Sequence, residues 1–115
     1  MKLRVVIVDD HATFRRSARR LLELGGFDVV GEAVDGASGV ELARELEPDV
    51  LLLDVVLPDM SGFDVAERVV GSKVVLVSSR ARTDFGLRLD QSRAIGFISK
   101  DELSMQALRE LLEAA

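Results

Sequence analysis

Five side chains that can take part in chemistry stand at or just beyond the ends of apolar runs: Asp9, Asp10, Asp54, Ser78 and Lys100. In an open parallel sheet, ligands bind in the crevice outside the carboxyl ends of the strands. If these runs are strands of one such sheet, three carboxylates, one hydroxyl and one ammonium share a pocket. This combination predicts a metal-assisted phosphoryl site in which an aspartate is the group that becomes modified.

The carboxylates of Asp9, Asp10 and Asp54 predict a bound divalent cation. Ionised together they would repel one another, and a cation removes that penalty. A site made only of oxygen ligands favours Mg²⁺, or Mn²⁺, over zinc. Asp9 and Asp10 could instead merely cap a helix that begins near His11. That alternative leaves the third carboxylate, at another strand end, unexplained.

The ammonium and the hydroxyl complete the predicted phosphoryl site. Lys100 would neutralise phosphoryl oxygens, Ser78 would donate a hydrogen bond, and Asp54 would be the attacking nucleophile. Simpler roles are a salt bridge for Lys100 and a cap or turn position for Ser78. His11 is the only histidine. A phospho-relay role is conceivable for it, but a helix start beside two aspartates favours a solvent-facing position at the pocket rim.

Strand-like and helix-like segments alternate along the whole chain, and the strand-like ones are rich in Val, Ile, Leu or Phe. We expect strands at 3–8, 27–33, 50–53, 73–77 and 95–98. We expect helices at 12–24, 37–47, 62–70, 84–93 and 103–113. This alternation predicts βαβ crossovers, and therefore an α/β, flavodoxin-like doubly wound fold with a five-stranded parallel sheet and five helices.

Local signals support the expected helix ends. Gly25 and Pro48 end the first and second helices, and Ser61 with Asp64 fits a capping box for the third. The fourth helix is the weakest expectation because Gly86 lies inside it. Either this helix is short and mobile, or its second apolar side meets a partner.

The composition is that of one globular domain spanning residues 1–115. The 115 residues are 48% hydrophobic and 30% charged, which is typical of a folded chain and not of a disordered one. No apolar run approaches the roughly 20 residues that a membrane-spanning helix needs, and the N-terminus lacks the features of a signal peptide. Cysteine is absent, so we expect no disulfide, and a cytoplasmic location is the default.

The charge balance disfavours one class of partner. A formal net charge of −5 argues against direct nucleic-acid binding by this domain. Four arginines nevertheless cluster on the polar side of the first expected helix: Arg15, Arg16, Arg19 and Arg20. They form either a solvated helix face or a docking face for an acidic protein partner.

The pattern VVIVDDH, LLLDVVLPDMSG, VVLVSSR and GFISKDEL resembles the receiver (CheY-like) domain of bacterial two-component response regulators. The resemblance covers essentially the whole chain and is closest to the LuxR/NarL-type subfamily. It implies that Asp54 is the phospho-acceptor. It also implies that Asp10 binds Mg²⁺ directly, that Asp9 does so through water, and that the backbone carbonyl of Val56 is a further ligand.

The resemblance also implies a two-state switch. Lys100 matches the lysine of the family motif, Ser78 the switch hydroxyl and Phe97 the switch aromatic, while Pro58 and Gly62 match the loop after the phosphorylation site. Phosphorylation would draw the hydroxyl inward, let the aromatic ring turn and repack the surface of the fourth helix, fifth strand and fifth helix. An aromatic residue in a short strand could also be ordinary core packing.

The same resemblance implies the partners. The phosphoryl group would come from a histidine kinase, a phosphotransfer protein or a small phosphodonor, and phosphorylation could lead to a homodimer. No membrane contact is expected. The natural protein is either a stand-alone receiver or the receiver half of a helix-turn-helix transcriptional regulator.

The chain departs from the family pattern at several places. The segment at 69–73 is shorter than usual by about one helical turn, which predicts a truncated third helix, and Asp101 replaces the usual proline after the lysine. Val56 and Arg80 occupy two positions that modulate loss of the phosphoryl group in the family. We hypothesise that apolar Val56 and bulky Arg80 hinder the hydrolytic water and give a long-lived phospho-form.

Two other function classes fit the residues less well. A phosphatase of the haloacid dehalogenase type needs a second aspartate as general acid two residues after the nucleophile, where this chain has Val56. A flavin-binding module needs a Ser/Thr/Gly-rich phosphate loop after the first strand, where this chain has Asp9, Asp10 and His11. We therefore expect no enzyme activity beyond self-phosphorylation and autodephosphorylation.

Overall fold

The computed structural model describes residues 2–115, which form one parallel sheet with helices on both faces. The strands are β1 (Arg4–Val8), β2 (Asp28–Ala33), β3 (Val50–Asp54), β4 (Lys73–Ser78) and β5 (Gly96–Ser99). Their order in the sheet is β2-β1-β3-β4-β5. The direction of winding reverses between β1 and β3, and the crevice beyond the carboxyl ends of such a pair is where ligands bind in doubly wound folds. The predicted flavodoxin-like fold is confirmed.

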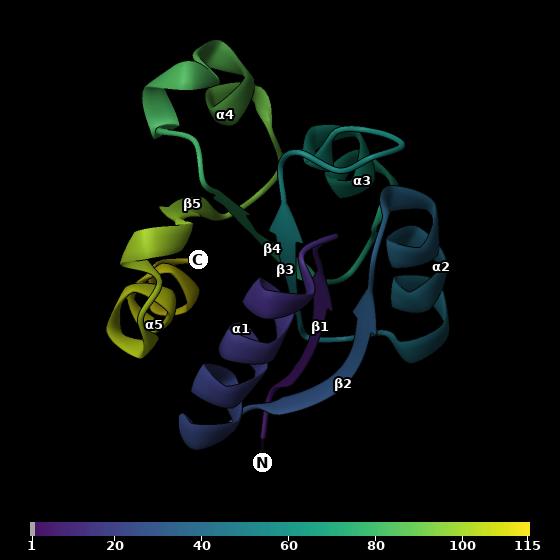
Figure 1. Ribbon diagram of the computed structural model, residues 1–115, viewed down its shortest axis with the longest axis vertical. Helices are drawn as coiled ribbons and strands as arrows, with labels where there is room; N and C mark the ends of the chain where they lie inside the picture. Colours follow the sequence, from purple (N-terminus) through teal and green to yellow (C-terminus); the bar gives the residue numbers. More distant parts are fainter. Residues whose placement is uncertain (1) are drawn as a thin grey trace.

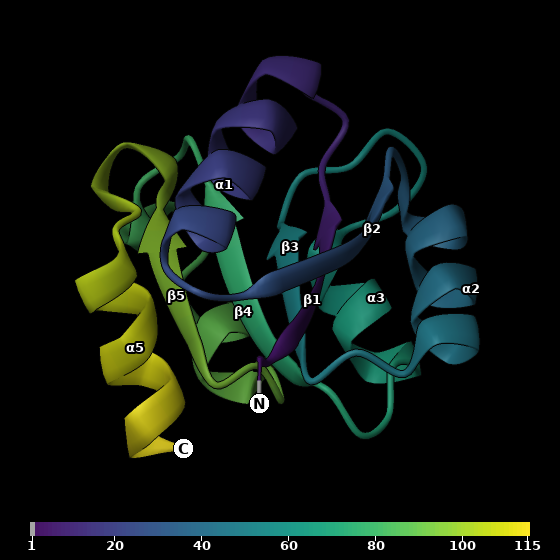
Figure 2. The ribbon, with the colours of Figure 1, turned by 90° about the horizontal axis from the view of Figure 1, so that it is seen from below.

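Within residues 2–115, five α-helices and two short 3₁₀-helices lie between the strands or follow the last one. They are α1 (Ala12–Leu24), α2 (Gly36–Leu46), α3 (Gly62–Arg68), η1 (Arg82–Asp84), α4 (Leu87–Gln91), η2 (Lys100–Glu102) and α5 (Met105–Ala114). Helices α1 and α5 cover one face of the sheet, and α2, α3 and α4 cover the other (Figures 1 and 2). No helix among residues 2–115 is long and apolar enough to span a membrane.

The central strands are apolar on both sides because both sides are covered. In β1, Val5 and Ile7 belong to the core beneath α1 and α5, whereas Val6 and Val8 belong to the core beneath α2 and α3. All four are fully buried. Successive side chains of a strand point to opposite faces, so an uninterrupted apolar run is what a strand buried on both faces requires.

The predicted fourth helix over 84–93 is wrong in extent. Its place is taken by η1, a turn and the five-residue α4. Gly86 lies in the turn with φ of 55°, a left-handed conformation that interrupts the helix and that glycine adopts without steric cost. Leu87, the first residue of α4, is 72% exposed, so its side chain lies mostly outside the core.

Helices α3 and α5 both begin after a capping serine, at the predicted residue 62 for α3 and later than predicted for α5. Ser61 Oγ accepts the N–H of Asp64 at 3.2 Å, and α3 then ends at Arg68, in line with the predicted truncation. Ser104 Oγ accepts the N–H of Ala107 at 3.0 Å, so α5 begins two residues after the predicted start at 103. A side-chain oxygen that satisfies a first-turn N–H is the usual start of a helix.

Candidate functional site

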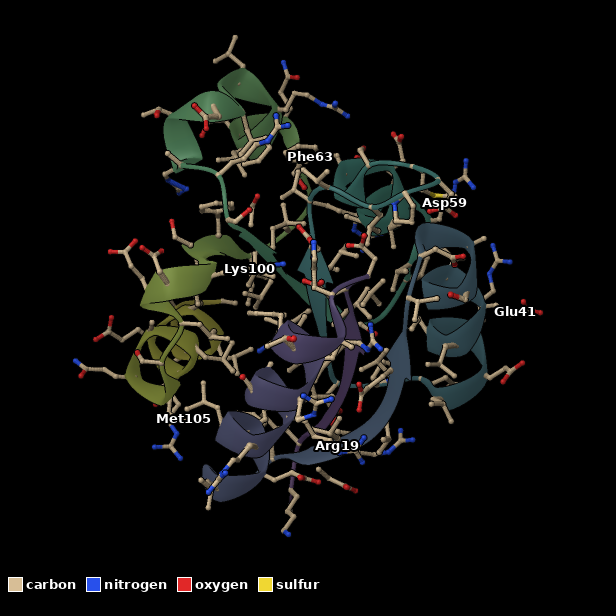
Figure 3. All side chains as sticks on the ribbon, viewed as in Figure 1. Arg19, Glu41, Asp59, Phe63, Lys100 and Met105 are labelled. Atoms are coloured by element: carbon tan, nitrogen blue, oxygen red, sulfur yellow. The ribbon has the colours of Figure 1, made fainter. Side chains whose placement is uncertain are left out.

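The carboxyl edge of the sheet brings the predicted chemical groups together. Asp54 and Ser78 are the last residues of β3 and β4, and Asp9 directly follows β1. These are the only buried polar or charged residues in the described chain. The strand arrows end at this edge in Figure 2, and Lys100 lies beside it in Figure 3. The register of parallel strands therefore places side chains from distant parts of the sequence side by side.

Lys100 lies between the two buried carboxylates. Its Nζ atom is 2.6 Å from Asp9 Oδ2 and 3.1 Å from Asp54 Oδ2. The same atom lies 4.5 Å from the centre of the Phe14 ring on α1, a cation–π distance. The ammonium is held from three sides, and its side chain is only 14% exposed. Lys100 thus forms the salt bridge that was considered as its simpler role. Its neutralisation of phosphoryl oxygens stays a prediction.

Burial raises the pKa of the Asp54 carboxyl, since a charged group loses hydration inside the protein. The neighbouring charge of Asp9 acts in the same direction. The N–H of Val56, which donates to Asp54 Oδ1 at 3.1 Å, and the ammonium of Lys100 act against it. The net result is a carboxylate whose negative charge is incompletely compensated by the protein.

The acidic groups fit a hard divalent cation. Ligand atoms of Asp9, Asp10, Asp54 and His11 all lie within 4.8 Å of one another. Asp9 Oδ2 is buried and makes no hydrogen bond of acceptable geometry, although Lys100 approaches it closely. Proximity without a well-directed bond leaves acceptor capacity on that oxygen, and a cation coordinated by oxygen atoms can use it. The cluster could therefore bind a metal ion.

His11 lies at the rim of the pocket and faces solvent, as predicted from the sequence. Its side chain is 64% exposed, and its Nδ1 lies 3.1 Å from Asp9 Oδ1 and 3.2 Å from Asp10 Oδ1. The capping alternative for the two aspartates is wrong, because α1 has His11 as its N-cap and no side-chain cap. Instead, Asp9 Oδ1 accepts the backbone N–H of His11 at 2.8 Å. Contact of the imidazole with both carboxylates was not anticipated from the sequence.

The loop between β3 and α3 is tightly joined to Asp54, the predicted phospho-acceptor. Val56 pairs with Ser61 as an isolated antiparallel bridge, and the N–H of Gly62 donates to the carbonyl of Val55 at 2.7 Å. A Cβ atom on Gly62 would overlap the backbone of Asp54. Only glycine fits there, which accounts for its place in the motif. The role of the Val56 carbonyl as a ligand stays a prediction.

Ser78 and Phe97 lie on the same face of the sheet. Ser78 pairs with Ser99 and Leu76 pairs with Phe97 in the β4–β5 register, so these four side chains share one face. Ser78 Oγ accepts the N–H of Arg80 at 3.1 Å. The Phe97 ring is partly buried, so it contacts the core and solvent at once. This position is compatible with both the switch role and ordinary packing.

An aromatic row connects β5 with α3. The ring of Phe85 lies 5.8 Å from that of Phe97 and 5.9 Å from that of Phe63. The guanidinium of Arg88 lies 4.5 Å above Phe63. Beside this row is a cavity of about 360 Å³ that also borders Val56 and Arg80. The sequence did not predict the row, because its members are far apart along the chain.

The arginine cluster on α1 is largely paired within the protein. Glu32 on β2 accepts Arg15 Nε at 3.1 Å and Arg19 Nη1 at 2.7 Å. The hydrogen bond with Glu32 is the main cause that raises the pKa of Arg19, and the charge of Glu23 acts in the same direction. Only Arg16 and Arg20 of the four remain mainly exposed, so the docking face considered from the sequence is smaller than expected.

Comparison with known proteins gives one consistent result. The model of the response regulator receiver domain family matches residues 5–113. The transcriptional regulatory protein NarL of Mycobacterium tuberculosis is 39% identical over 99% of this chain and 55% of its own length. The nitrate/nitrite response regulator NarP of Escherichia coli is 41% identical over 91% of this chain and 53% of its own. The chain thus spans about half the length of these relatives.

Solved structures agree with the sequence relatives. The signal receiver domain of Mycobacterium tuberculosis NarL superimposes with a TM-score of 0.86 at 37% identity, covering 98% of this chain and 95% of that one. A LuxR-family two-component response regulator from Aurantimonas gives a TM-score of 0.87 at 28% identity, covering 99% and 87% of the two chains. Family model, relatives and fold coincide over nearly the whole chain, which belongs to the response regulator receiver domain family, with relatives of the LuxR/NarL type.

Proposed function

We propose that this receiver domain is a phosphorylation switch whose acceptor is Asp54. The observation that carries the proposal is the buried pair of carboxylates, Asp9 and Asp54, bridged by one ammonium at 2.6 and 3.1 Å. The two carboxylates carry one more negative charge than Lys100 can balance. They can therefore bind a divalent cation, and the positive charge of that cation can in turn attract an anionic phosphoryl group. Residues 1–115 together make this domain.

The metal in this proposal is Mg²⁺, with Mn²⁺ as a substitute. Asp9, Asp10, Asp54 and the carbonyl of Val56 would hold it, and the ion would supply positive charge opposite the phosphoryl oxygens. The Oδ2 atom of Asp9 is buried and makes no well-directed hydrogen bond, although Lys100 lies close, which supports this assignment. His11 lies mostly in solvent, so its imidazole can leave the carboxylates without any rearrangement of the core.

The transfer step needs little covalent work from the protein. A carboxylate oxygen of Asp54 attacks phosphorus, the bond from phosphorus to the donor breaks, and the donor leaves with the bonding electron pair. The donor is a phosphohistidine of a histidine kinase or phosphotransfer protein, or a small acyl phosphate. Lys100 stabilises the charge on the transferred group, which is the main demand of phosphoryl transfer.

The output follows from the shared face of Ser78 and Phe97. When the hydroxyl turns toward the phosphoryl group, space opens on that face and the aromatic ring can follow, changing the surface formed by α4, β5 and α5. The change would promote a homodimer or control a partner. Because NarL and NarP are named as regulators and exceed this chain in length, we propose transcriptional control through a DNA-binding module, in the cytoplasm, with no nucleic acid bound by this domain itself.

Intact-mass spectrometry with acetyl phosphate and Mg²⁺ tests the assignment. We expect one phosphoryl adduct on the wild type, none after Asp54→Ala, and none when EDTA removes the metal. Asp28→Ala, at an exposed position in β2, is the matched control and should be modified like the wild type. An unmodified wild type, or an adduct that persists in Asp54→Ala, would reject Asp54 as the acceptor.

The lifetime of the phospho-form is a second test. Val56 is 45% exposed and borders the same cavity as Arg80, so both can obstruct water near the acceptor. We expect Val56→Asn to speed loss of the phosphoryl adduct, while Val70→Asn, at a remote site that is 84% exposed, leaves the rate unchanged. Equal lifetimes in all three proteins would remove the proposed obstruction.

A further inference from the structure

Asp59 connects two elements that are distant in the sequence. It lies in the loop between β3 and α3, and both of its carboxylate oxygens accept backbone N–H groups at the start of α2. Gly36 donates to Oδ1 at 2.7 Å, and Ala37 donates to Oδ2 at 2.9 Å. Figure 3 shows Asp59 beside this end of α2. These bonds lower the pKa of Asp59, because they favour the ionised carboxylate.

Helix α2 already has a cap of its own. Asp35 Oδ1 accepts the N–H of Ser38 at 2.9 Å. The first N–H groups of any helix lack partners within that helix. Here the local aspartate satisfies one of them, and the distant aspartate satisfies two more. The contact therefore does something beyond ordinary capping: it attaches the β3–α3 loop to α2.

The attached loop is the one that surrounds the phospho-acceptor. At its base, the N–H of Val56 donates to Asp54 Oδ1 at 3.1 Å, and the Val56–Ser61 bridge closes the loop. At its far end, a Cβ atom on Gly36 would overlap the side chain of Met60, so the loop and α2 approach as closely as glycine allows. Asp59 provides the hydrogen bonds at this far end.

We propose that Asp59 is a positioning residue for the metal site, acting through the loop that carries Val56. It touches neither the cation nor the phosphoryl group. It holds the backbone of Val56 where the N–H orients Asp54 and where the carbonyl can serve as a ligand. This inference rests on the proposed Mg²⁺-dependent phosphorylation and identifies α2 as the support of that site.

The test is the Mg²⁺ affinity of Asp59→Asn, measured by chemical-shift titration of the ¹⁵N-labelled domain. Asparagine keeps the shape but turns an N–H₂ group toward one of the two donors. Mutation of residues that hydrogen-bond to metal ligands typically weakens metal affinity by about 10- to 100-fold. Asp59 acts less directly, through the loop, so its effect on Mg²⁺ affinity should be about tenfold or smaller. We expect binding weaker by about fivefold to tenfold. Acetyl phosphate labelling should slow at low Mg²⁺ and recover at saturating Mg²⁺.

Asp35→Ala is the matched control, because it removes the side-chain acceptor that caps the same helix and leaves both hydrogen bonds of Asp59 in place. We expect wild-type Mg²⁺ affinity for it, even if both variants melt at lower temperature. Wild-type affinity in Asp59→Asn would overturn the inference and leave Asp59 as a helix cap only. An equal loss in both variants would also overturn it, since the effect would then come from the stability of α2.

A second variant perturbs the same contact with the carboxylate intact. Gly36→Ala would push Met60 and the loop away from α2, and we expect weaker Mg²⁺ binding from it as well. Unchanged binding would contradict a role for this contact. A wild-type domain that binds no Mg²⁺ and accepts no phosphoryl group would instead refute the proposed function. If only the inference fails, the wild type binds Mg²⁺ and accepts the phosphoryl group, and the variants bind Mg²⁺ as tightly as the wild type does.

Discussion

Replacing Asp54 by asparagine should stabilise the folded domain when no divalent cation is present. Burial and the charge of Asp9 raise the pKa of Asp54 in the folded protein. A raised pKa means that the carboxyl contributes most to stability when protonated, below its unfolded pKa, and that this contribution is lost as the pH rises through the folded pKa. At neutral pH the ionised group therefore costs stability, which the neutral amide recovers.

The size of the gain follows from the distances. At an effective dielectric constant of about 20, a like charge within 4.8 Å, here Asp9, repels Asp54 by about 3.5 kcal/mol. Lys100 at 3.1 Å attracts it by about 5 kcal/mol. The attraction by Lys100 exceeds the repulsion by Asp9 only slightly. The loss of hydration of the buried Asp54 carboxylate costs several kcal/mol, which is more than this net attraction. We expect Asp54→Asn to raise the free energy of unfolding by about 1 to 2 kcal/mol.

The assay is urea denaturation followed by circular dichroism, since the chain has no Trp or Tyr for fluorescence. Measurements in EDTA at pH 7 should show the gain, and added Mg²⁺ should stabilise the wild type and reduce its difference from Asp54→Asn. Asp28→Asn, at an exposed position, controls for the loss of one negative charge. A variant less stable than the wild type in EDTA would refute the reasoning, because Lys100 would then compensate Asp54 fully.

Three further predictions concern the neighbours of the site. Lys100→Gln leaves two buried carboxylates without their ammonium and should lower the free energy of unfolding by about 3 kcal/mol in EDTA, with part of the loss reversed by Mg²⁺; a change below 1 kcal/mol would contradict this. Phe14→Leu should cost about 0.5 to 1 kcal/mol through the lost cation–π contact, and a double-mutant cycle should show no such extra loss in the Lys100→Gln background. The lowered pKa of Asp59 means that its contribution to stability is present above the usual Asp value of 3.8 and is lost as the pH falls through the lowered folded pKa. Asp59→Asn should therefore flatten the acid limb of the stability profile, and parallel acid limbs for wild type and variant would disprove the linkage.

Much of the architecture could be predicted because it depends on local pattern. The helix expected at 12–24 has those bounds in the structure, since its apolar stripe and the following glycines are adjacent in sequence. The strand expected at 50–53 continues by one residue, so Asp54 is the last residue of β3 and does not follow it. The helix expected at 84–93 is not continuous in the structure. Gly86 adopts a positive φ, which is incompatible with a helix interior and which glycine adopts without steric cost.

The pocket residues could be named in advance, but their contacts could not. Asp9, Asp54 and Ser78 could be predicted because they stand at the ends of apolar runs, and Lys100 because it stands in the segment GFISKDEL. The bond from Lys100 to both carboxylates spans most of the chain. It depends on the register of β1, β3 and β5 in the finished sheet. No short window of sequence contains that information.

Apolar runs, helical periodicity and acidic strand ends are properties of neighbouring residues, so the sequence by itself determined the fold class and the composition of the site. Exposure, ion pairing and support of the loop by Asp59 are properties of residues that meet only after packing. Tertiary structure alone decided these, because each depends on how closely separate elements approach. Gly36 and Gly62 illustrate the difference: the sequence shows two glycines, and the fold shows the backbone and side chains that leave no room for anything larger.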